Sequence, residues 1–165
     1  MLFKDLLVRK RKPFPGKIYW ECDDLRYGKA DWIQISGLDT SQQRTNWHDN
    51  LNFDIFKQWR YNQNDSLVQR DTILKAFSFP RKPAAVKGNY RDNEFHIETS
   101  AVGSFSIFIS PEMVNMDKPV TIFVNGLKRM SRLPEYNKKF IMRNFNSDRD
   151  RKAIWVDEFK IPAIR

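Results

Sequence analysis

The chain has 165 residues, a net charge of +9 at pH 7 and a single cysteine. This length suits one domain, and folding at this size buries roughly 70% of the surface of the unfolded chain, so the core needs no cross-link. Cys22 alone excludes an intrachain disulfide, and together with His48 and His96 it gives too few ligands for a Cys/His zinc site. We therefore predict no metal site and no cofactor.

The sequence carries no signal for a membrane or for secretion. Its apolar runs are all shorter than the ~20 residues that a membrane-spanning helix needs. A signal peptide has its positive charges before an apolar stretch, whereas the basic run at residues 9–12 follows the apolar residues of the N-terminus. We expect neither a membrane span nor a signal peptide in this chain.

The positive charge lies in two blocks. Residues 1–17 hold six Lys or Arg and one Asp, a net charge of +5, and residues 128–152 hold nine Lys or Arg and three acids, a net charge of +6. Such blocks are typical of polyanion-binding domains, but the solvated faces of ordinary domains have the same composition. The patterns of RNA-recognition and zinc-finger domains are missing. We favour solvated faces, expect no nucleic acid, and keep polyanion binding as an alternative.

The N-terminal part predicts the end of a helix followed by strands. The apolar residues within 2–7 fall at helical spacing, so residues 1–12 are expected to end an amphipathic helix before Pro13. Residues 17–22 and 31–35 alternate apolar and polar side chains, which predicts two strands. The domain proper is expected to span residues 13–165.

Residues 39–84 depart from this pattern and are treated as an excursion. Residues 39–64 predict a long loop with either one helical turn or an extra hairpin, and residues 66–79 predict one or two strands. The aromatic residues of the loop are interleaved with basic ones, a composition that binds sugars or bases in other proteins. The candidate ligand-stacking residues are Trp47, Trp59 and Tyr61. The alternative is that these rings pin the loop to the domain.

Trp20 and Trp32 fall on the two N-terminal strands. Large aromatics on alternating strands usually fill the core of a sandwich, so both are expected to be core residues. If either ring instead stacked on sugar together with the aromatics of the excursion, the chain would be a carbohydrate-binding module.

The middle of the chain predicts short strands at residues 85–90, 94–99 and 105–109, with turn residues between them. This spacing is typical of an antiparallel sandwich. We therefore predict a mainly β fold, an immunoglobulin-like antiparallel β-sandwich. His96 is expected to face solvent, opposite Phe95 and Ile97.

A second pair of strands, at residues 105–109 and 120–124, flanks a link that holds Pro111 and Pro119. The simplest interpretation is a β-sandwich hairpin. The apolar residues of the two strands, which are expected to pack together, are Phe105, Ile107, Ile109, Val120, Ile122 and Val124. Asn125-Gly126 suits a tight turn with positive φ, after which residues 128–133 return antiparallel.

The C-terminal part predicts a short helix near 135–145 and a last strand at 153–161. Within that strand, Asp157-Glu158 breaks the alternation and predicts a bulge.

Motifs for catalysis are absent from the sequence. It contains neither a Gly-x-Ser-x-Gly elbow, nor a phosphate-binding glycine loop, nor a His-Glu-x-x-His pair. Asp23-Asp24 and Asp157-Glu158 are paired carboxylates of the kind used in acid–base chemistry. The first pair lies in a turn and the second in a strand, where neighbours point to opposite faces, so turn formation and solvation explain them better. We predict no catalytic residue in this chain.

Several segments resemble one family. The chain has Arg-Lys-Pro-Phe-Pro at 11–15, Ile-Tyr-Trp at 18–20, Asp-Leu-Arg-Tyr-Gly-Lys-Ala-Asp-Trp-Ile at 24–33, Asn-x-Phe-x-Ile at 93–97, and Met-Val-Asn-Met-Asp-Lys-Pro-Val-Thr-Ile-Phe-Val-Asn-Gly at 113–126. These segments are similar to the C-terminal β-domain of bacterial α/β-hydrolase-type esterases and peptidases. Asn115 stands where that family more usually has Asp. The resemblance covers residues 9–37 and 85–161 and leaves the excursion without a counterpart.

The resemblance implies a non-catalytic accessory domain. Residues 1–12 would be the seam to a catalytic domain absent from this chain, and the Ser, Asp and His of the family's triad lie upstream, so no catalytic residue is carried over. The implied partner is the α/β-hydrolase domain of a parent protein, secreted or periplasmic, with a second copy of the chain as the other expected partner.

Overall fold

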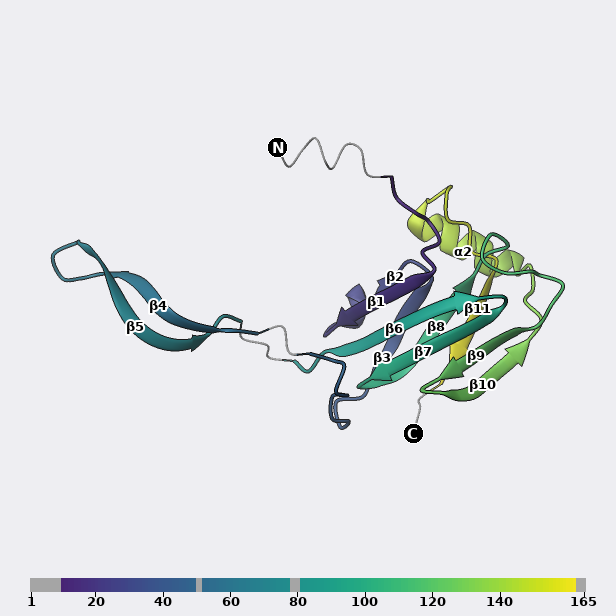
Figure 1. The fold of residues 1–165 in the computed structure, drawn as a ribbon. Helices are drawn as coiled ribbons and strands as arrows, with labels where there is room; N and C mark the ends of the chain where they lie inside the picture. The colour runs from purple at the N-terminus through teal and green to yellow at the C-terminus, as the bar shows by residue number, and fades with distance from the viewer. Residues whose placement is uncertain (1–9, 50–51, 78–80, 163–165) are drawn as a thin grey trace. The chain divides into compact units, whose positions relative to one another are not determined.

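The computed structural model describes residues 10–49, 52–77 and 81–162. The chain divides into two compact units, one formed by Met1–Thr45 with Pro83–Arg165 and the other by Asn46–Lys82 (Figure 1). We call the first the sandwich unit and the second the arm. The arm lies within the predicted excursion, whose first and last residues belong to the sandwich unit.

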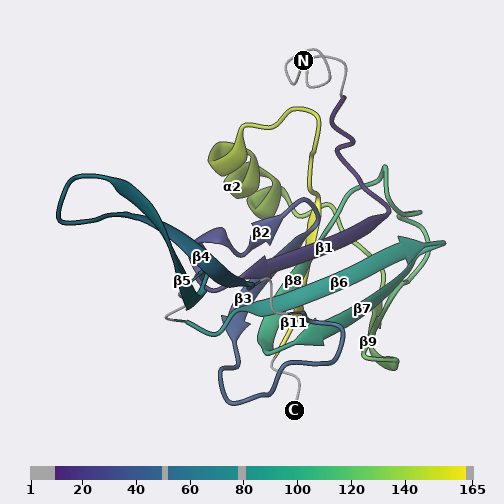
Figure 2. The same cartoon turned by 60° about the vertical axis from the view of Figure 1, so that its left-hand side comes forward.

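The sandwich unit consists of two sheets that lie face to face (Figure 2). One sheet has five strands in the order β1-β6-β7-β9-β10, and the other has four in the order β11-β8-β3-β2. The strands are β1 (Lys17–Cys22), β2 (Lys29–Ala30), β3 (Ile33–Leu38), β6 (Ala84–Arg91), β7 (Glu94–Ser100), β8 (Val102–Ile109), β9 (Val120–Val124), β10 (Leu127–Arg132) and β11 (Asp157–Ile161). The chain is therefore mainly β with a sandwich-like architecture, as predicted.

Strand direction differs from the prediction at one place. In the part of the chain that the structure describes, neighbouring strands run antiparallel except β7 and β9, which run parallel. The chain reaches β9 from β8, which belongs to the opposite sheet, rather than through a tight turn from β7. The direction of β9 is thus set by a crossing between sheets, which permits a parallel neighbour.

The hairpin predicted for β8 and β9 is therefore wrong, because the two strands lie in different sheets. Their expected apolar faces are nevertheless correct. The six residues are fully buried within one hydrophobic cluster: Phe105, Ile107, Ile109, Val120, Ile122 and Val124. Alternation identifies the buried face of a strand, but it does not identify the strand alongside.

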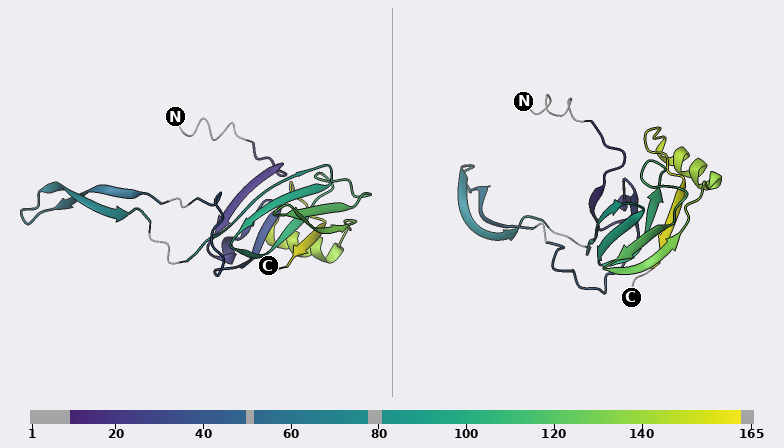
Figure 3. Two further views of the ribbon diagram at one scale, coloured as in Figure 1. Left: turned by 60° about the horizontal axis from the view of Figure 1, so that its bottom comes forward. Right: turned by 45° about the vertical axis from the view of Figure 1, so that its right-hand side comes forward.

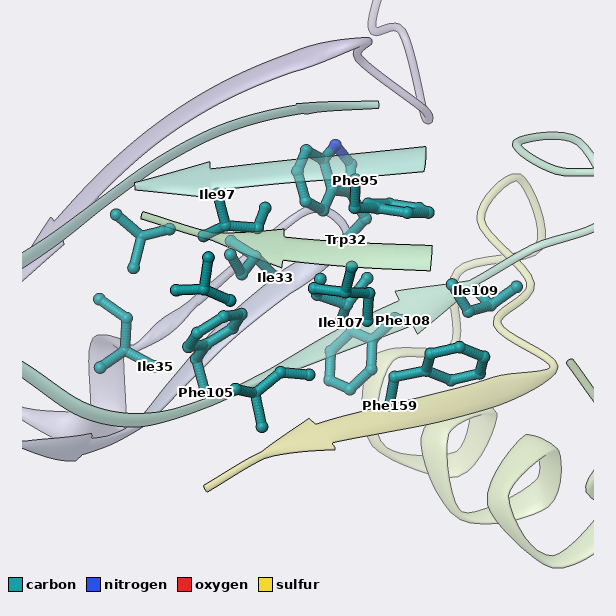
Figure 4. Close-up of a cluster of buried hydrophobic side chains, with 14 of the residues drawn as sticks. Trp32, Ile33, Ile35, Phe95, Ile97, Phe105, Ile107, Phe108, Ile109 and Phe159 are labelled. Atoms are coloured by element: carbon teal, nitrogen blue, oxygen red, sulfur yellow. The ribbon is translucent and has the colours of Figure 1, made fainter. Parts of the chain in front are cut away.

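Trp32 lies at the centre of the core (Figure 4). It is fully buried, and its ring meets those of Tyr90 and Phe95 edge-on, with centroids 5.6 and 5.5 Å away. Its indole N–H donates to the carbonyl of Pro15 at 2.7 Å, so the polar atom is satisfied inside the core. Trp20 lies at the margin of the core, half-buried, and donates to the Tyr27 carbonyl at 2.8 Å.

The turn between β9 and β10 has the predicted form. Asn125 and Gly126 have φ of 50° and 80°, the left-handed values that the tightest hairpin turns require. The Asn125 carboxamide oxygen also accepts the backbone N–H of Thr99 at 2.9 Å. This residue therefore shapes the turn and ties it to β7.

The predicted C-terminal helix is α2 (Lys138–Asp148), which starts slightly later than expected. Asn137 caps its first turn by accepting the N–H of Phe140 at 3.0 Å. Phe140 is buried, and its ring centroid lies 5.8 Å from that of Phe108.

The last strand differs from its prediction in two ways. Residues 153–156 precede β11 without strand structure, and β11 pairs with β8 in an uninterrupted register from Asp157 to Ile161. The bulge predicted at Asp157-Glu158 is therefore absent. Asp157 shares the buried face of β11 with Phe159 and Ile161, and the ion pair with Arg132 compensates its charge there.

Residues 10–12, where the predicted N-terminal helix of residues 1–12 was expected to end, are not helical. Residues 1–9 lie outside the described part of the chain. Among the described residues, none belongs to a helix of the length and hydrophobicity needed to cross a membrane.

The arm is a curved ribbon of two antiparallel strands, β4 (Asp54–Tyr61) and β5 (Leu67–Lys75) (Figure 3). The excursion thus contains a hairpin, but only its first strand comes from the loop predicted at 39–64, and its second comes from the run predicted as strand at 66–79. The pairing is regular from Lys57 to Tyr61 and shifts register between Ile55 and Lys57.

Candidate functional site

The arm contains all three predicted ligand-stacking residues, and the structure places two of them on one face. Trp59 and Tyr61 are alternate residues of β4, and their pairing with Gln69 and Leu67 of β5 is regular. Side chains two apart on a strand share a face. Trp59 is 59% exposed and Tyr61 is 72% exposed. The two rings therefore form an accessible aromatic pair.

The third predicted residue, Trp47, lies before β4 rather than on it. It is half-buried, and its ring stacks on that of His48 with centroids 6.0 Å apart. Trp47 thus belongs to the part of the arm that precedes β4 and not to its strands. Neither Trp20 nor Trp32 belongs to the aromatic pair, since Trp32 is fully buried and Trp20 packs against the core of the sandwich unit.

Asparagine side chains hold both ends of the hairpin. At its base, the Asn52 side chain donates to the Phe77 carbonyl at 2.8 Å and accepts the backbone N–H groups of Phe53 and Phe77, each at 3.0 Å. At its tip, Asn62 accepts the N–H groups of Asn64 and Ser66 at 2.9 and 3.0 Å. The bonds at the tip are local. Two of those at the base join Asn52 to Phe77, far apart in the sequence, and there the rings of Phe53 and Phe77 also meet edge-on with centroids 5.8 Å apart.

Apolar side chains of the arm other than the predicted ones are also exposed. More than two-fifths of each is accessible in Phe53, Phe56, Leu67, Ile73, Leu74 and Phe77. An open hollow of about 430 Å³ lies between Phe56, Lys57, Asp71, Thr72 and Ile73. The β-type run at 66–79 predicts the strand β5. The sequence does not identify the partner of this strand, so it does not predict that the side chains of β5 are exposed.

A second hollow, of about 370 Å³, lies beside the link between β8 and β9 and is lined by Asp92, Asn93, Pro111, Glu112, Met113, Val114, Asn115 and Lys118. Asn93 is buried and fully engaged: it donates to the carbonyls of Asn115 and Lys118 at 2.7 and 3.1 Å and accepts the Asn115 N–H at 2.8 Å. The Asn93 side chain uses its hydrogen bonds to hold the link, so this buried group is not free to bind a ligand in the hollow.

The paired carboxylates both have structural partners. Asp24 accepts the backbone N–H of Arg26 at 3.0 Å, which caps a 3-10 turn, and pairs with its guanidinium at 2.8 Å. Asp157 pairs with the Arg132 guanidinium and accepts the N–H groups of Glu135 and Glu158 at 2.9 and 2.8 Å. Such saturated carboxylates are poor candidates for proton transfer. Among the described residues, the groups that titrate or ligate are not gathered into a metal-binding cluster.

The two basic blocks are partly neutralised by ion pairs. Arg11 pairs with Asp150, and Arg143 pairs with Glu158 at 3.4 Å. The hydrogen bond that Arg11 donates to Asp150 raises the pKa of Arg11, and the same contact lowers the pKa of Asp150. Each cation engaged in this way offers less charge to a polyanion, so the geometry gives the polyanion alternative no specific support.

Comparison with protein-family models, with curated proteins and with solved structures finds no match to this chain. The features of this chain that bear on function are therefore the sandwich unit and the exposed surface of the arm.

Proposed function

We propose that the chain is a non-catalytic accessory domain, similar to the C-terminal β-domain of α/β-hydrolase-type esterases and peptidases, and that its sandwich is of the immunoglobulin-like kind. In this role it supports a catalytic domain or helps it to engage substrate. The observation that carries the proposal is the contact between Trp32 and Pro15, because it joins two of the segments that resemble the family.

The role of the resembling residues supports this proposal. Gly28 is buried, and its carbonyl accepts the N–H of Ile35 at 2.9 Å, while Asn93 holds the link between β8 and β9. The same residues that carry the likeness thus build the framework of the sandwich unit. A scaffold of this kind is expected of a domain that supports a partner.

An assay of the purified chain against short p-nitrophenyl esters tests the proposal. We expect no turnover above the background rate of hydrolysis. Turnover that one point mutation abolishes would overturn the accessory role.

The reading frame upstream of Met1 provides the complementary test. An in-frame Gly-x-Ser-x-Gly motif there would identify the catalytic partner, whereas an unrelated upstream sequence would rule out a parent hydrolase.

A carbohydrate-binding module is the second candidate, favoured by the exposure of Trp59 and Tyr61 on one face of β4. Rings on a strand surface stack on sugar faces in the way they stack on bases. Affinity electrophoresis in gels that contain a soluble polysaccharide tests this role. Retardation that Trp59→Ala removes and Trp47→Ala leaves unchanged would support it, and equal mobility with and without polysaccharide, over a panel of neutral glucans and xylans, would reject it.

A further inference from the structure

The arm exposes apolar surface out of proportion to its size. Among its described residues, eight large apolar side chains are exposed: Phe53, Phe56, Trp59, Tyr61, Leu67, Ile73, Leu74 and Phe77, of which Ile73 is 78% accessible. At about 150–250 Å² for each aromatic side chain and rather less for the aliphatic ones, the accessible part sums to roughly 900 Å². A stable protein interface takes about 800 Å² from each partner. The exposed apolar surface of the arm is therefore comparable in extent to one side of a stable interface.

The number of strands in the arm points the same way. A two-stranded hairpin is at best marginally stable in water, and three or more strands with an apolar face are needed for independent stability. Within the described residues, β4 and β5 form a sheet of two strands only, so each has one edge without a neighbouring strand. A partner that adds strands would supply what the hairpin lacks.

The direction of the backbone groups identifies the free edge of β4. The N–H of Asn62 donates to the carbonyl of Ser66 at 2.9 Å, so this pair is a hydrogen-bonded one. Hydrogen-bonded and non-hydrogen-bonded pairs alternate along an antiparallel ladder. In the regular part of β4, the backbone N–H and C=O of Lys57, Trp59 and Tyr61 therefore point away from β5 and are available to another strand.

We propose that β4 of one copy pairs antiparallel with β4 of a second copy, about a two-fold axis that passes beside Trp59. In this register Trp59 faces Trp59 of the partner subunit, Lys57 faces Tyr61 of the partner subunit, and Gln58 faces Arg60 of the partner subunit. The three outward-pointing residues of each strand then form about six hydrogen bonds between the copies. The result is a four-stranded sheet, β5-β4-β4-β5.

The charges of β4 fit a second copy of itself. Residues that oppose each other across two strands lie on the same face of the sheet. Lys57 and Arg60 are three residues apart and lie on opposite faces, so a two-fold register never places one opposite the other. The register centred on Trp59 also keeps each of these cations away from its own copy. Lys57 instead lies beside the Tyr61 ring of the partner subunit, and a cation beside an aromatic ring is attracted to it. This interface goes beyond the accessory role and does not depend on it.

A proline at the free edge tests the pairing. Tyr61→Pro removes an outward-pointing N–H of β4, and Leu67→Pro removes the corresponding outward-pointing N–H of β5 at the residue opposite Tyr61. Both substitutions spare the bonds between β4 and β5, and both lose one exposed apolar side chain. The mass of the full chain is measured by light scattering after size exclusion, from about 1 to about 100 µM.

The wild type and Leu67→Pro are expected to have twice the monomer mass of 19.7 kDa at high concentration, and Tyr61→Pro is expected to stay at the monomer mass. A wild type that stays monomeric at every concentration would overturn the proposal and leave the arm to a partner of another kind. A Tyr61→Pro variant as dimeric as the wild type would overturn the β4 edge as the interface.

Cross-linking tests the register independently of stability. Residues that face each other across a hydrogen-bonded pair have Cα atoms about 5.5 Å apart, within the range for a disulfide. Trp59→Cys is expected to form a disulfide-linked dimer under mild oxidation, whereas Gln69→Cys, opposite Trp59 on β5, is not. The buried Cys22 makes the wild type a control without a cross-link. Equal cross-linking of the two variants, or none by Trp59→Cys in a dimeric protein, would overturn the register.

Discussion

Arg132 and Asp157 join the edges of the two sheets. Two guanidinium nitrogens of Arg132, on β10, donate to the two carboxylate oxygens of Asp157, on β11, at 2.8 and 3.1 Å. Strand β10 ends the five-stranded sheet and β11 ends the four-stranded one. Arg132 also lies 3.7 Å from the ring centroid of Phe159. A charged bidentate pair thus closes one side of the sandwich unit.

Loss of this pair is expected to destabilise the fold. Asp157 is only 5% exposed, and removal of one partner leaves the other unpaired in a region of low solvation. Asp157→Ala should cost about 2–4 kcal/mol in the free energy of unfolding, somewhat less than the ~3–5 kcal/mol for a fully buried pair, because Arg132 retains some contact with water. Urea unfolding measures the loss. Glu98→Gln, which breaks the exposed pair of Glu98 with Lys87, is the control and should change stability by less than about 1 kcal/mol.

Asn93 makes a second testable contribution. Its φ of 65° is left-handed, and its carboxamide makes three hydrogen bonds to the link between β8 and β9. Asn93→Gly keeps the backbone conformation and loses the bonds, so we expect a loss of about 1–3 kcal/mol. Asn93→Ala loses the bonds and adds strain of about 1–2 kcal/mol. Equal stabilities of the two variants would show that the backbone conformation contributes nothing.

Two glycines of the sandwich unit are expected to respond to alanine in opposite ways. A Cβ atom at Gly28 would lie 2.4 Å from the backbone oxygen of Ile35, and that oxygen belongs to a strand that cannot move aside. Gly28→Ala should therefore destabilise by more than about 1 kcal/mol. Gly16 has open space at the same position, so Gly16→Ala should stabilise by up to about 1 kcal/mol through the unfolded chain. Thermal unfolding of the two variants measures both effects.

Cys22 is expected to be inert in the folded chain. Burial, together with the charges of Asp23, Asp24 and Glu21, raises the pKa of its thiol to about 11. Since the thiolate is the reactive form, labelling by a disulfide reagent near neutral pH should be at least about 100-fold slower in the native than in the unfolded protein. Rapid native labelling would show that the residue is accessible.

The same thiol gives a pH dependence of known sign. Between the ordinary thiol pKa of about 8.5 and the native value, the unfolded chain releases the proton and the folded chain keeps it. The stability contribution of the protonated Cys22 is therefore complete below that interval and is lost as the pH rises through it. The stability advantage of the wild type over Cys22→Ala should be smaller at about pH 10.5 than at about pH 8.

The sequence predicts much of the sandwich unit because its strands are marked locally. Alternation identified β1 and β3, the regular spacing of short strands between turns identified β6 and β7, and Asn125-Gly126 identified the turn before β10. Sheet membership could not be read in the same way, since the partner of β9 is decided by a link of ten residues between Ile109 and Val120 that crosses from one sheet to the other. Local patterns contain no information about such a crossing.

The candidate site was predicted only in part. The density of aromatics in the excursion indicated Trp59 and Tyr61 as candidate ligand-stacking residues, and both side chains are exposed. Trp47 lies in the same aromatic-rich excursion but precedes the paired strands β4 and β5. Placing Trp59 and Tyr61 on one face required the pairing of β4 with β5, which follows from tertiary structure and not from spacing alone.

The division into two units separates the two kinds of change that this chain can undergo. Every strand of both sheets of the sandwich unit finds its neighbours without β4 or β5. Substitutions on the surface of the arm therefore alter what the chain contacts and leave untouched the pairings that specify the sandwich. The exposed residues of the arm can therefore vary at little cost to the foldability of the sandwich unit.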